Sequence, residues 1–107
     1  DLGRKAEALQ AMQEAAEISR GILARRPDAE LPGFASNLFN LGVALRGLGR
    51  NEEALHAMEE GIRRLAPSAS RRAAFRERIE GQVKRYRDLC AEMGREPDSE
   101  LLRLLES

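Results

Sequence analysis

The chain has 107 residues, enough for one compact domain or for part of a longer helical array. Charged residues make up 34% and aromatic residues 4%, with no Trp and a formal net charge of zero. The balanced charge gives no overall attraction to nucleic acid, and no apolar run approaches the roughly 20 residues that a membrane-spanning helix needs. The single cysteine, Cys90, cannot form an internal disulfide or by itself hold a metal.

The chain begins abruptly on Asp1-Leu2-Gly3-Arg4, without an initiator Met. No secretory pattern opens it, and its single cysteine is compatible with a reducing cytoplasm. We therefore expect a cytoplasmic protein with no membrane segment. The abrupt opening also predicts that this sequence is a fragment of a longer chain.

An internal repeat is the main feature of the sequence. Leu2-Gly3-Arg4, Leu48-Gly49-Arg50 and Met93-Gly94-Arg95 recur at offsets of 46 and 45 residues. A period in this range indicates stacked structural units. Each Gly is predicted to end one helix and allow the next to begin, because Gly adopts the left-handed conformation at low steric cost. The offset of 46 also pairs Glu7-Ala8-Leu9 with Glu53-Ala54-Leu55, Ala11-Met12 with Ala57-Met58, and Glu14 with Glu60.

Apolar residues three and four positions apart predict five helices, because that spacing places them on one helix face. The predicted helices span about 4–25, 34–47, 51–65, 70–93 and 98–106. Asn51 is predicted to cap the third helix, Pro67 to end it, and Ser68 or Ser70 to cap the fourth. The fourth helix is expected to bury Phe75, Ile79, Val83, Tyr86, Cys90 and Met93, and the first to carry Ala8, Leu9, Met12, Ala15, Ala16, Ile18, Ile22 and Leu23 near one side.

The segment 37–55 resembles a tetratricopeptide repeat, with Leu41-Gly42, the turn residue Gly49 and Ala54-Leu55 in the family's order, followed by Met58 and Gly61. The resemblance implies an all-α fold of antiparallel helical hairpins stacked as an α-solenoid. Residues 1–32 would be the second half of one repeat, 33–67 the best-matching repeat, and 68–107 a degenerate repeat or capping helices. The period exceeds the family's usual length of about 34 residues. In this it is similar to the repeats of kinesin light chains and of bacterial regulatory proteins.

The resemblance implies a protein-binding scaffold or regulatory sensor, in which the first helix of each hairpin lines a concave groove for a peptide or helix. Phe39 is one of the residues predicted to line this groove, and the alternative is that it packs on the neighbouring helix. The clamp that some family members use for acidic carboxyl tails needs Lys and Asn where Phe39 and Val43 stand, so that mode is disfavoured. The predicted groove residues are Ser36, Phe39, Asn40, Val43 and Arg46.

Charge is distributed unevenly along the chain, with net values of −3 for residues 1–62, +7 for 63–87 and −4 for 88–107. Arginines can pair with carboxylates or phosphates, so the basic stretch allows an acidic partner or nucleic acid. The second functional hypothesis is therefore a helical arm of a nucleic-acid-associated regulator, although nucleic acid is the less favoured partner. The simpler alternative is a solvated face balanced by acidic neighbours. The stretch contains Arg63, Arg64, Arg71, Arg72, Arg76, Arg78, Lys84, Arg85 and Arg87.

Residues with catalytic or metal-binding chemistry are scarce. His56 is expected on the outer side of the third helix without a second ligand, and Cys90 is expected in the core. No phosphate-binding Gly-rich loop and no Ser/His/Asp set is present. We therefore predict no enzyme activity, no catalytic residue, no cofactor and no metal.

The first helix is apolar over much of its surface. In the resemblance, Ala8, Leu9, Met12 and Ala15 would receive a helix that precedes the first one. A repeat unit cannot bury its faces alone. We therefore expect either an upstream repeat in the intact protein or self-association of the fragment through its first helix.

Overall fold

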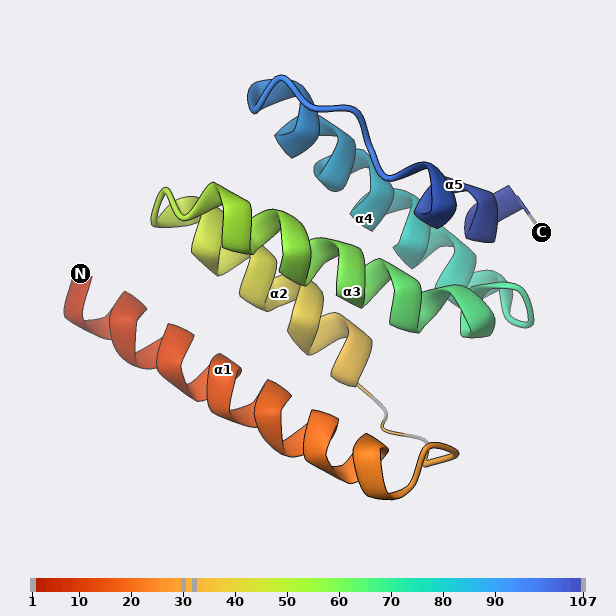
Figure 1. Cartoon of the computed structure of the whole chain (residues 1–107), viewed down its shortest axis with the longest axis horizontal. Coiled ribbons are helices and arrows are strands. Elements are labelled where there is room, and N and C mark those ends of the chain that lie inside the picture. The colour runs from red at the N-terminus through yellow and green to blue at the C-terminus, as the bar shows by residue number, and fades with distance from the viewer. Residues whose placement is uncertain (1, 30, 32, 107) are drawn as a thin grey trace.

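Five α-helices and no strand make up the residues that the computed structural model describes, which are 2–29, 31 and 33–106. Each helix runs opposite to the one before it (Figure 1). The prediction of an all-α fold with five helices is confirmed. The helices are α1 (Leu2–Arg25), α2 (Phe34–Gly47), α3 (Asn51–Ala69), α4 (Ala73–Glu92) and α5 (Ser99–Glu106).

The turn at Gly49 makes α2 and α3 an antiparallel hairpin. Gly49 has a φ of 78°, its N–H donates to the carbonyl of Arg46, and the N–H of Arg50 donates to the carbonyl of Leu45. These two bonds form a Schellman motif, which satisfies carbonyls at the end of α2. Inside the hairpin, a Cβ built on Gly42 would lie 2.7 Å from Cγ of Met58. The helices therefore approach as closely as the sequence predicts.

The same turn recurs at the end of α4. Gly94 has a φ of 66°, its N–H donates to the carbonyl of Ala91, and the N–H of Arg95 donates to the carbonyl of Cys90. Two of the three Gly-Arg steps are therefore helix-ending turns, 45 residues apart. The first is not, because Gly3 lies within α1. The prediction of a turn at Gly3 is wrong.

The core centres on α3, which packs against α2, α4 and α5 (Figure 1). Its buried residues cover one broad face of the helix, while Glu52, Glu53 and His56 on the opposite side are exposed. The buried residues are Ala54, Leu55, Ala57, Met58, Gly61, Ile62, Leu65 and Ala69. From α5, Leu101 closes the core at 1% exposure, whereas Leu104 is 48% exposed.

Helix α1 is attached less extensively, and its main neighbour is α2. Among the α1 residues whose burial is described, Leu9 and Ala16 are buried, while Met12 and Leu23 are partly buried against the core. Ile18 is 66% exposed, so the expectation that it shares the packed side is wrong. A salt bridge between Arg20 and Glu60, at 2.6 Å, ties the outer part of α1 to α3. 

Three predictions about helix ends are wrong. Asn51 is the first residue of α3 and not its cap, and Arg50 before it pairs with Glu53 at 2.5 Å. Pro67 does not end α3, which continues to Ala69. A proline in the last turn removes only one backbone donor, and Ser70 Oγ closes that turn by donating to the carbonyl of Pro67 at 2.8 Å. Neither Ser68 nor Ser70 caps α4, because Arg72 occupies the N-cap position.

The buried face of α4 is rotated from the predicted one. Ile79, Tyr86 and Cys90 are buried as expected, but Phe75, Val83 and Met93 are only partly buried. Two further residues complete the face, Leu89 at 0% exposure and Gln82 at 7%. Oε1 of Gln82 has no hydrogen-bond partner in the described part of the chain.

Candidate functional site

Four of the five predicted groove residues on α2 reach the surface. Asn40 is exposed, and Val43 is exposed to 37% although it is apolar. Ser36 and Arg46 are half-buried because both are bonded to α4. These residues lie on the side of α2 that faces toward α4.

Phe39 behaves differently, since it is only 4% exposed. Its backbone N lies 3.0 Å from the position that a Cβ on Gly61 would take, so it sits in the contact between α2 and α3. The prediction that Phe39 lines an open groove is wrong. The alternative, that Phe39 packs on the neighbouring helix, is confirmed.

Two side-chain links connect α2 to α4. Near the helix starts, Nη1 of Arg78 donates to Oγ of Ser36 at 3.3 Å, and near the helix ends Arg46 forms a salt bridge with Glu92. Start meets start and end meets end, so α2 and α4 run parallel, as Figure 1 shows. We name the region between the links the α2–α4 surface. It carries Asn40 and Val43 from α2 and, by helical spacing from Arg78, Gly81 and Arg85 from α4.

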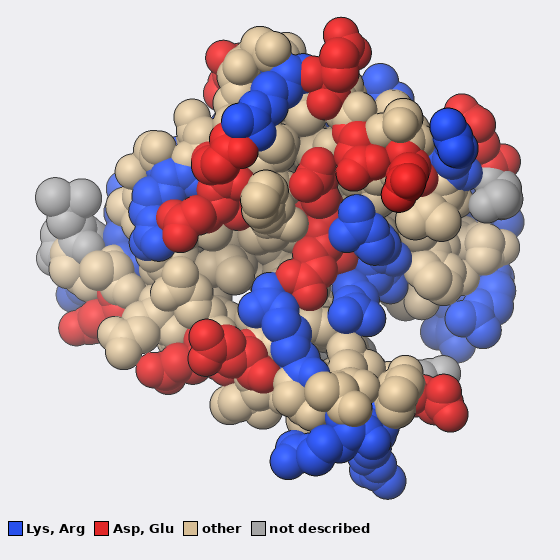
Figure 2. All heavy atoms as spheres, viewed as in Figure 1, with Lys and Arg blue, Asp and Glu red and all other residues tan. Residues whose placement is uncertain are grey.

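All nine side chains of the basic stretch 63–87 are exposed, as expected. Figure 2 shows acidic and basic side chains intermingled over one face, with Lys and Arg gathered toward the connection between α3 and α4. The stretch does not form one patch. Five of its members line a single depression, and the other four, Arg76, Lys84, Arg85 and Arg87, do not.

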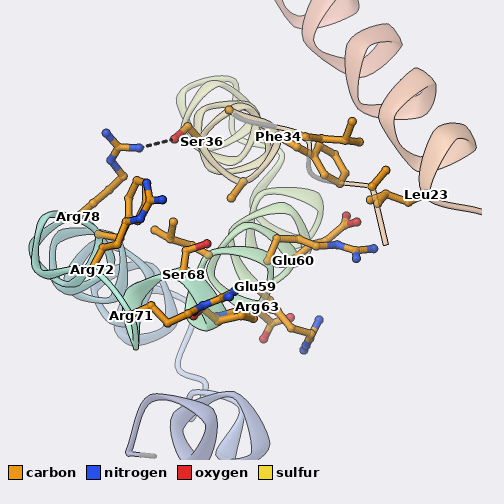
Figure 3. Close-up of a pocket in the computed structure, with 18 of the residues that line it drawn as sticks. Leu23, Phe34, Ser36, Glu59, Glu60, Arg63, Ser68, Arg71, Arg72 and Arg78 are labelled. Carbon is orange, nitrogen blue, oxygen red and sulfur yellow. Dashed lines mark hydrogen bonds between the residues drawn. The ribbon is translucent and has the colours of Figure 1, made fainter. Parts of the chain in front are cut away.

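That depression is an open cavity of about 1190 Å³ at one end of the helices. Its walls come from the end of α1 and the loop after it, the start of α2, the second half of α3 and the start of α4. Figure 3 shows Ser36, Arg72 and Arg78 grouped on one side of α3, with Leu23, Phe34 and Glu60 on the side toward α1. We name it the arginine pocket. Its basic side chains are Arg63, Arg64, Arg71, Arg72 and Arg78, with His56 beside them.

Two aromatic rings hold three of these guanidinium groups. Arg72 and Arg78 lie 5.8 and 5.4 Å from the centre of the Phe75 ring, and Arg64 lies 5.7 Å from that of Phe34. A guanidinium over a ring face is attracted by the ring's negative face, which orients the cation without neutralising it. Arg71 is held by a bond from its Nε to the carbonyl of Pro67 at 3.3 Å.

Two of the three acidic residues that line the pocket are bonded to residues outside it. Glu60 accepts two hydrogen bonds from Arg20, and Glu59 accepts one from the hydroxyl of Tyr86 at 2.6 Å. None of the pocket's five arginines forms a salt bridge with a carboxylate of the described residues, since the recorded salt bridges involve other arginines. The simpler alternative for the basic stretch is that acidic neighbours balance its charge. For these five arginines, no such ion pairing is observed.

A buried polar node lies behind the pocket. The Tyr86 hydroxyl donates to Glu59 and accepts the N–H of Asp98 at 2.9 Å, and Asp98 Oδ1 in turn accepts the N–H groups of Glu100 and Leu101 at the start of α5. Burial raises the pKa of the Tyr86 hydroxyl far above its ordinary value of 10.0. Burial likewise raises the pKa of the Cys90 thiol above 9.0. Both groups therefore remain protonated at neutral pH, and a reactive thiolate is disfavoured at Cys90.

The other chemistry-bearing residues are not brought together. His56 is exposed at the rim of the arginine pocket, while Cys90 is 1% exposed in the core. Within the described residues, no three His, Cys, Asp or Glu side chains are grouped so that they could hold a metal ion.

No family model, no curated protein and no solved structure matches this chain significantly. Of the helices described, none is both long and apolar enough to cross a membrane.

The arrangement of the pocket could be found only in part from the sequence. The density of arginines in 63–87 identifies a basic region, and Phe75 lies between Arg72 and Arg78 at helical spacing. The contributions of Ser36 and Phe34 come from a different helix. No local signal in the sequence connects them to the arginines.

Proposed function

We propose that the chain is an interaction module of tetratricopeptide type that binds a segment of another protein and has no catalytic activity of its own. The recurrence of one turn geometry at Gly49 and Gly94, 45 residues apart, supports a repeat architecture. The close approach of α2 and α3 at Gly42 and Gly61 fits the small residues that the family places where helices cross. 

The α2–α4 surface is the observation that carries this proposal. Parallel helices linked at both ends present Asn40, with amide donors and an acceptor, next to the exposed apolar Val43. A side chain added at Gly81 would meet nothing within 4 Å, so the opposite wall leaves room. An apolar anchor beside a free amide suits a peptide, whose backbone needs hydrogen-bond partners and whose side chains need apolar contact.

Selection of peptides from a random displayed library against the full chain tests the proposal. Binding of enriched peptides to Val43→Asp should be weaker by at least about tenfold, because a carboxylate at the anchor must lose its hydration. Ala24→Asp, an exposed position on α1, provides the matched control and should leave binding unchanged. The proposal fails if no peptide is enriched, or if the enriched peptides bind Val43→Asp as tightly as the parent chain.

Self-association through α1 belongs to the same proposal. At the offset of 46, Ala8, Met12 and Ala15 correspond to Ala54, Met58 and Gly61, the positions of α3 that α2 covers. In α1 the first of these is exposed and the other two are half-buried. In α3 this face packs against α2, whereas the corresponding face of α1 remains open. We propose that a second copy of the chain covers it.

A further inference from the structure

We propose that the arginine pocket is a second binding site, which takes an acidic segment of a partner protein that also carries apolar side chains. The inference rests on the proposed function only in that the partner is a protein. It concerns the surface at the connection between α3 and α4, which meets the α2–α4 surface at the Arg78–Ser36 link.

The first argument is uncompensated charge. Five guanidinium groups line one depression, and none is paired with a carboxylate of the described residues. Like charges held close together destabilise the fold, so the arrangement is not explained by stability. The start of α4 adds to the positive field, because its first turn contains no acidic residue and no side chain caps it.

The second argument is that the guanidinium groups are oriented but still have free donors. Arg78 uses one nitrogen on Ser36 and its face on the ring of Phe75, while Arg72 contacts the same ring. A guanidinium has five N–H donors in a fixed plane. Cations placed in this way, with most of their donors unused, are ready to bind oxyanions in pairs.

The occupant must match the rest of the lining. Leu23 and Leu31, both half-buried, supply apolar surface toward α1, and a volume of about 1190 Å³ is larger than most small-molecule sites. A peptide in which Asp or Glu alternates with apolar residues matches both parts of the pocket. Its carboxylates would meet the arginines at the start of α4, and its apolar side chains would meet the end of α1.

Nucleic acid fits less well, for two reasons. Phe34 is only 4% exposed, and two arginines already lie over the ring of Phe75, so a base would have to displace them to stack there. Asp28, Glu59 and Glu60 also line the pocket, and they would repel an unbroken phosphate backbone. A peptide avoids this repulsion because its charges are discrete.

The test is fluorescence anisotropy with a labelled peptide of alternating Glu pairs and Leu or Phe, and the full chain as the receptor. Binding should weaken by at least about tenfold in Arg72→Gln/Arg78→Gln, which removes two charge-assisted contacts. The matched control is Lys84→Gln/Arg87→Gln, which removes the same charge from exposed positions of α4 outside the pocket and should change binding less than about twofold. Arg63→Gln/Arg64→Gln is the second pocket variant, in case loss of the Phe75 contacts unfolds the first.

Three results would overturn the inference. A peptide with Gln in place of Glu could bind as tightly as the Glu peptide. The pocket variant Arg72→Gln/Arg78→Gln and the control variant could weaken binding equally. A single-stranded oligonucleotide of equal charge could bind more tightly than the peptide and lose its binding in the pocket variants. Val43→Asp, measured in parallel, should leave this peptide bound. If it alone abolishes binding, the peptide occupies the α2–α4 surface, and the arginine pocket inference fails while the proposed function stands.

Discussion

Gly61 of α3 lies directly against the backbone of Phe39 in α2, so that a Cβ at Gly61 would come within 3.0 Å of the Phe39 nitrogen and of the Ala35 carbonyl oxygen. Backbone atoms cannot move aside as a flexible side chain can. The hairpin therefore depends on the absence of a side chain at this point, and the close contact is also what buries Phe39.

Gly61→Ala should lower the free energy of unfolding by about 1–3 kcal/mol, because overpacking exceeds the gain in helix propensity. Gly21→Ala is the matched control. Gly21 lies within α1 with nothing within 4 Å of a built Cβ, so its replacement should stabilise the fold by about 0.5–1 kcal/mol. Urea unfolding of both variants provides the measurement. Equal stabilisation by both changes would contradict the α2–α3 geometry.

Ala54→Leu should be destabilising for a related reason. Ala54 is 0% exposed, and its carbonyl oxygen lies 3.0 Å from where a Cβ on Gly42 would stand. Three added carbon atoms have no space between α2 and α3, so we expect a loss of about 1–3 kcal/mol. An unchanged melting temperature would mean that this face of α3 is not packed as described.

Gln82 offers a prediction of the opposite sign. Its side chain is 7% exposed, and Oε1 has no hydrogen-bond partner in the described part of the chain. Gln82→Met keeps the approximate volume and removes the unpaired oxygen, and should raise the free energy of unfolding by about 1 kcal/mol. Gln13→Met on α1, which is only half-buried, should change it little. A destabilised Gln82→Met would show that the amide has a partner in solution, such as an ordered water.

The sequence indicates the helices and two of the three turns correctly, because both signals are local. Apolar spacing reports a helix face, and Gly49 and Gly94 meet the need for a left-handed residue within their own turns. Where a side chain packs depends on residues distant in the sequence. Phe39 has helical spacing compatible with either a groove or a helix contact, and only the position of Gly61 decides between them.

The rotated face of α4 has a similar cause. The helix is rich in charged residues, so its apolar stripe is short and gives only a coarse direction for the buried face. The observed buried face includes Leu89 and also Gln82, a polar residue that apolar spacing does not predict to be buried. The arginine pocket also depends on tertiary structure, because Phe34 and Ser36 join the arginines only after α2 packs on α3.

Tyr86 leads to a pH prediction. Burial raises the pKa of its hydroxyl above 10.0, so the folded chain keeps the neutral form while the unfolded chain ionises. The contribution of Tyr86 to stability is therefore complete below about pH 10 and declines as pH rises further, by at most about 1.4 kcal/mol per pH unit. In Tyr86→Phe, the free energy of unfolding should therefore decline less steeply above pH 10 than in the parent chain. The raised pKa of Cys90 contributes separately, so Cys90→Ala is the background for the comparison.

The titration itself can be observed directly, because Tyr86 is the only Tyr in a chain without Trp. Absorbance near the tyrosinate band should show no ionisation at pH 10–11 until the protein unfolds. An ordinary titration near pH 10 in the folded protein would contradict the buried bonds of Tyr86 to Glu59 and Asp98.

The last prediction concerns the open face of α1, where Ala8, Ala11 and Ile18 are exposed and Ala15 and Ile22 half-buried at alternating steps of three and four. Such a stripe can pack against an identical stripe in a symmetric dimer. Sedimentation at tens of micromolar should show a dimer of the parent chain. Ala11→Glu/Ile18→Glu should give a monomer that remains folded, because neither side chain contributes to the buried core. Ala6→Glu, which adds a charge on the far side of the same helix, should leave the dimer intact. A parent chain that stays monomeric throughout this range would mean that α1 does not receive a second copy.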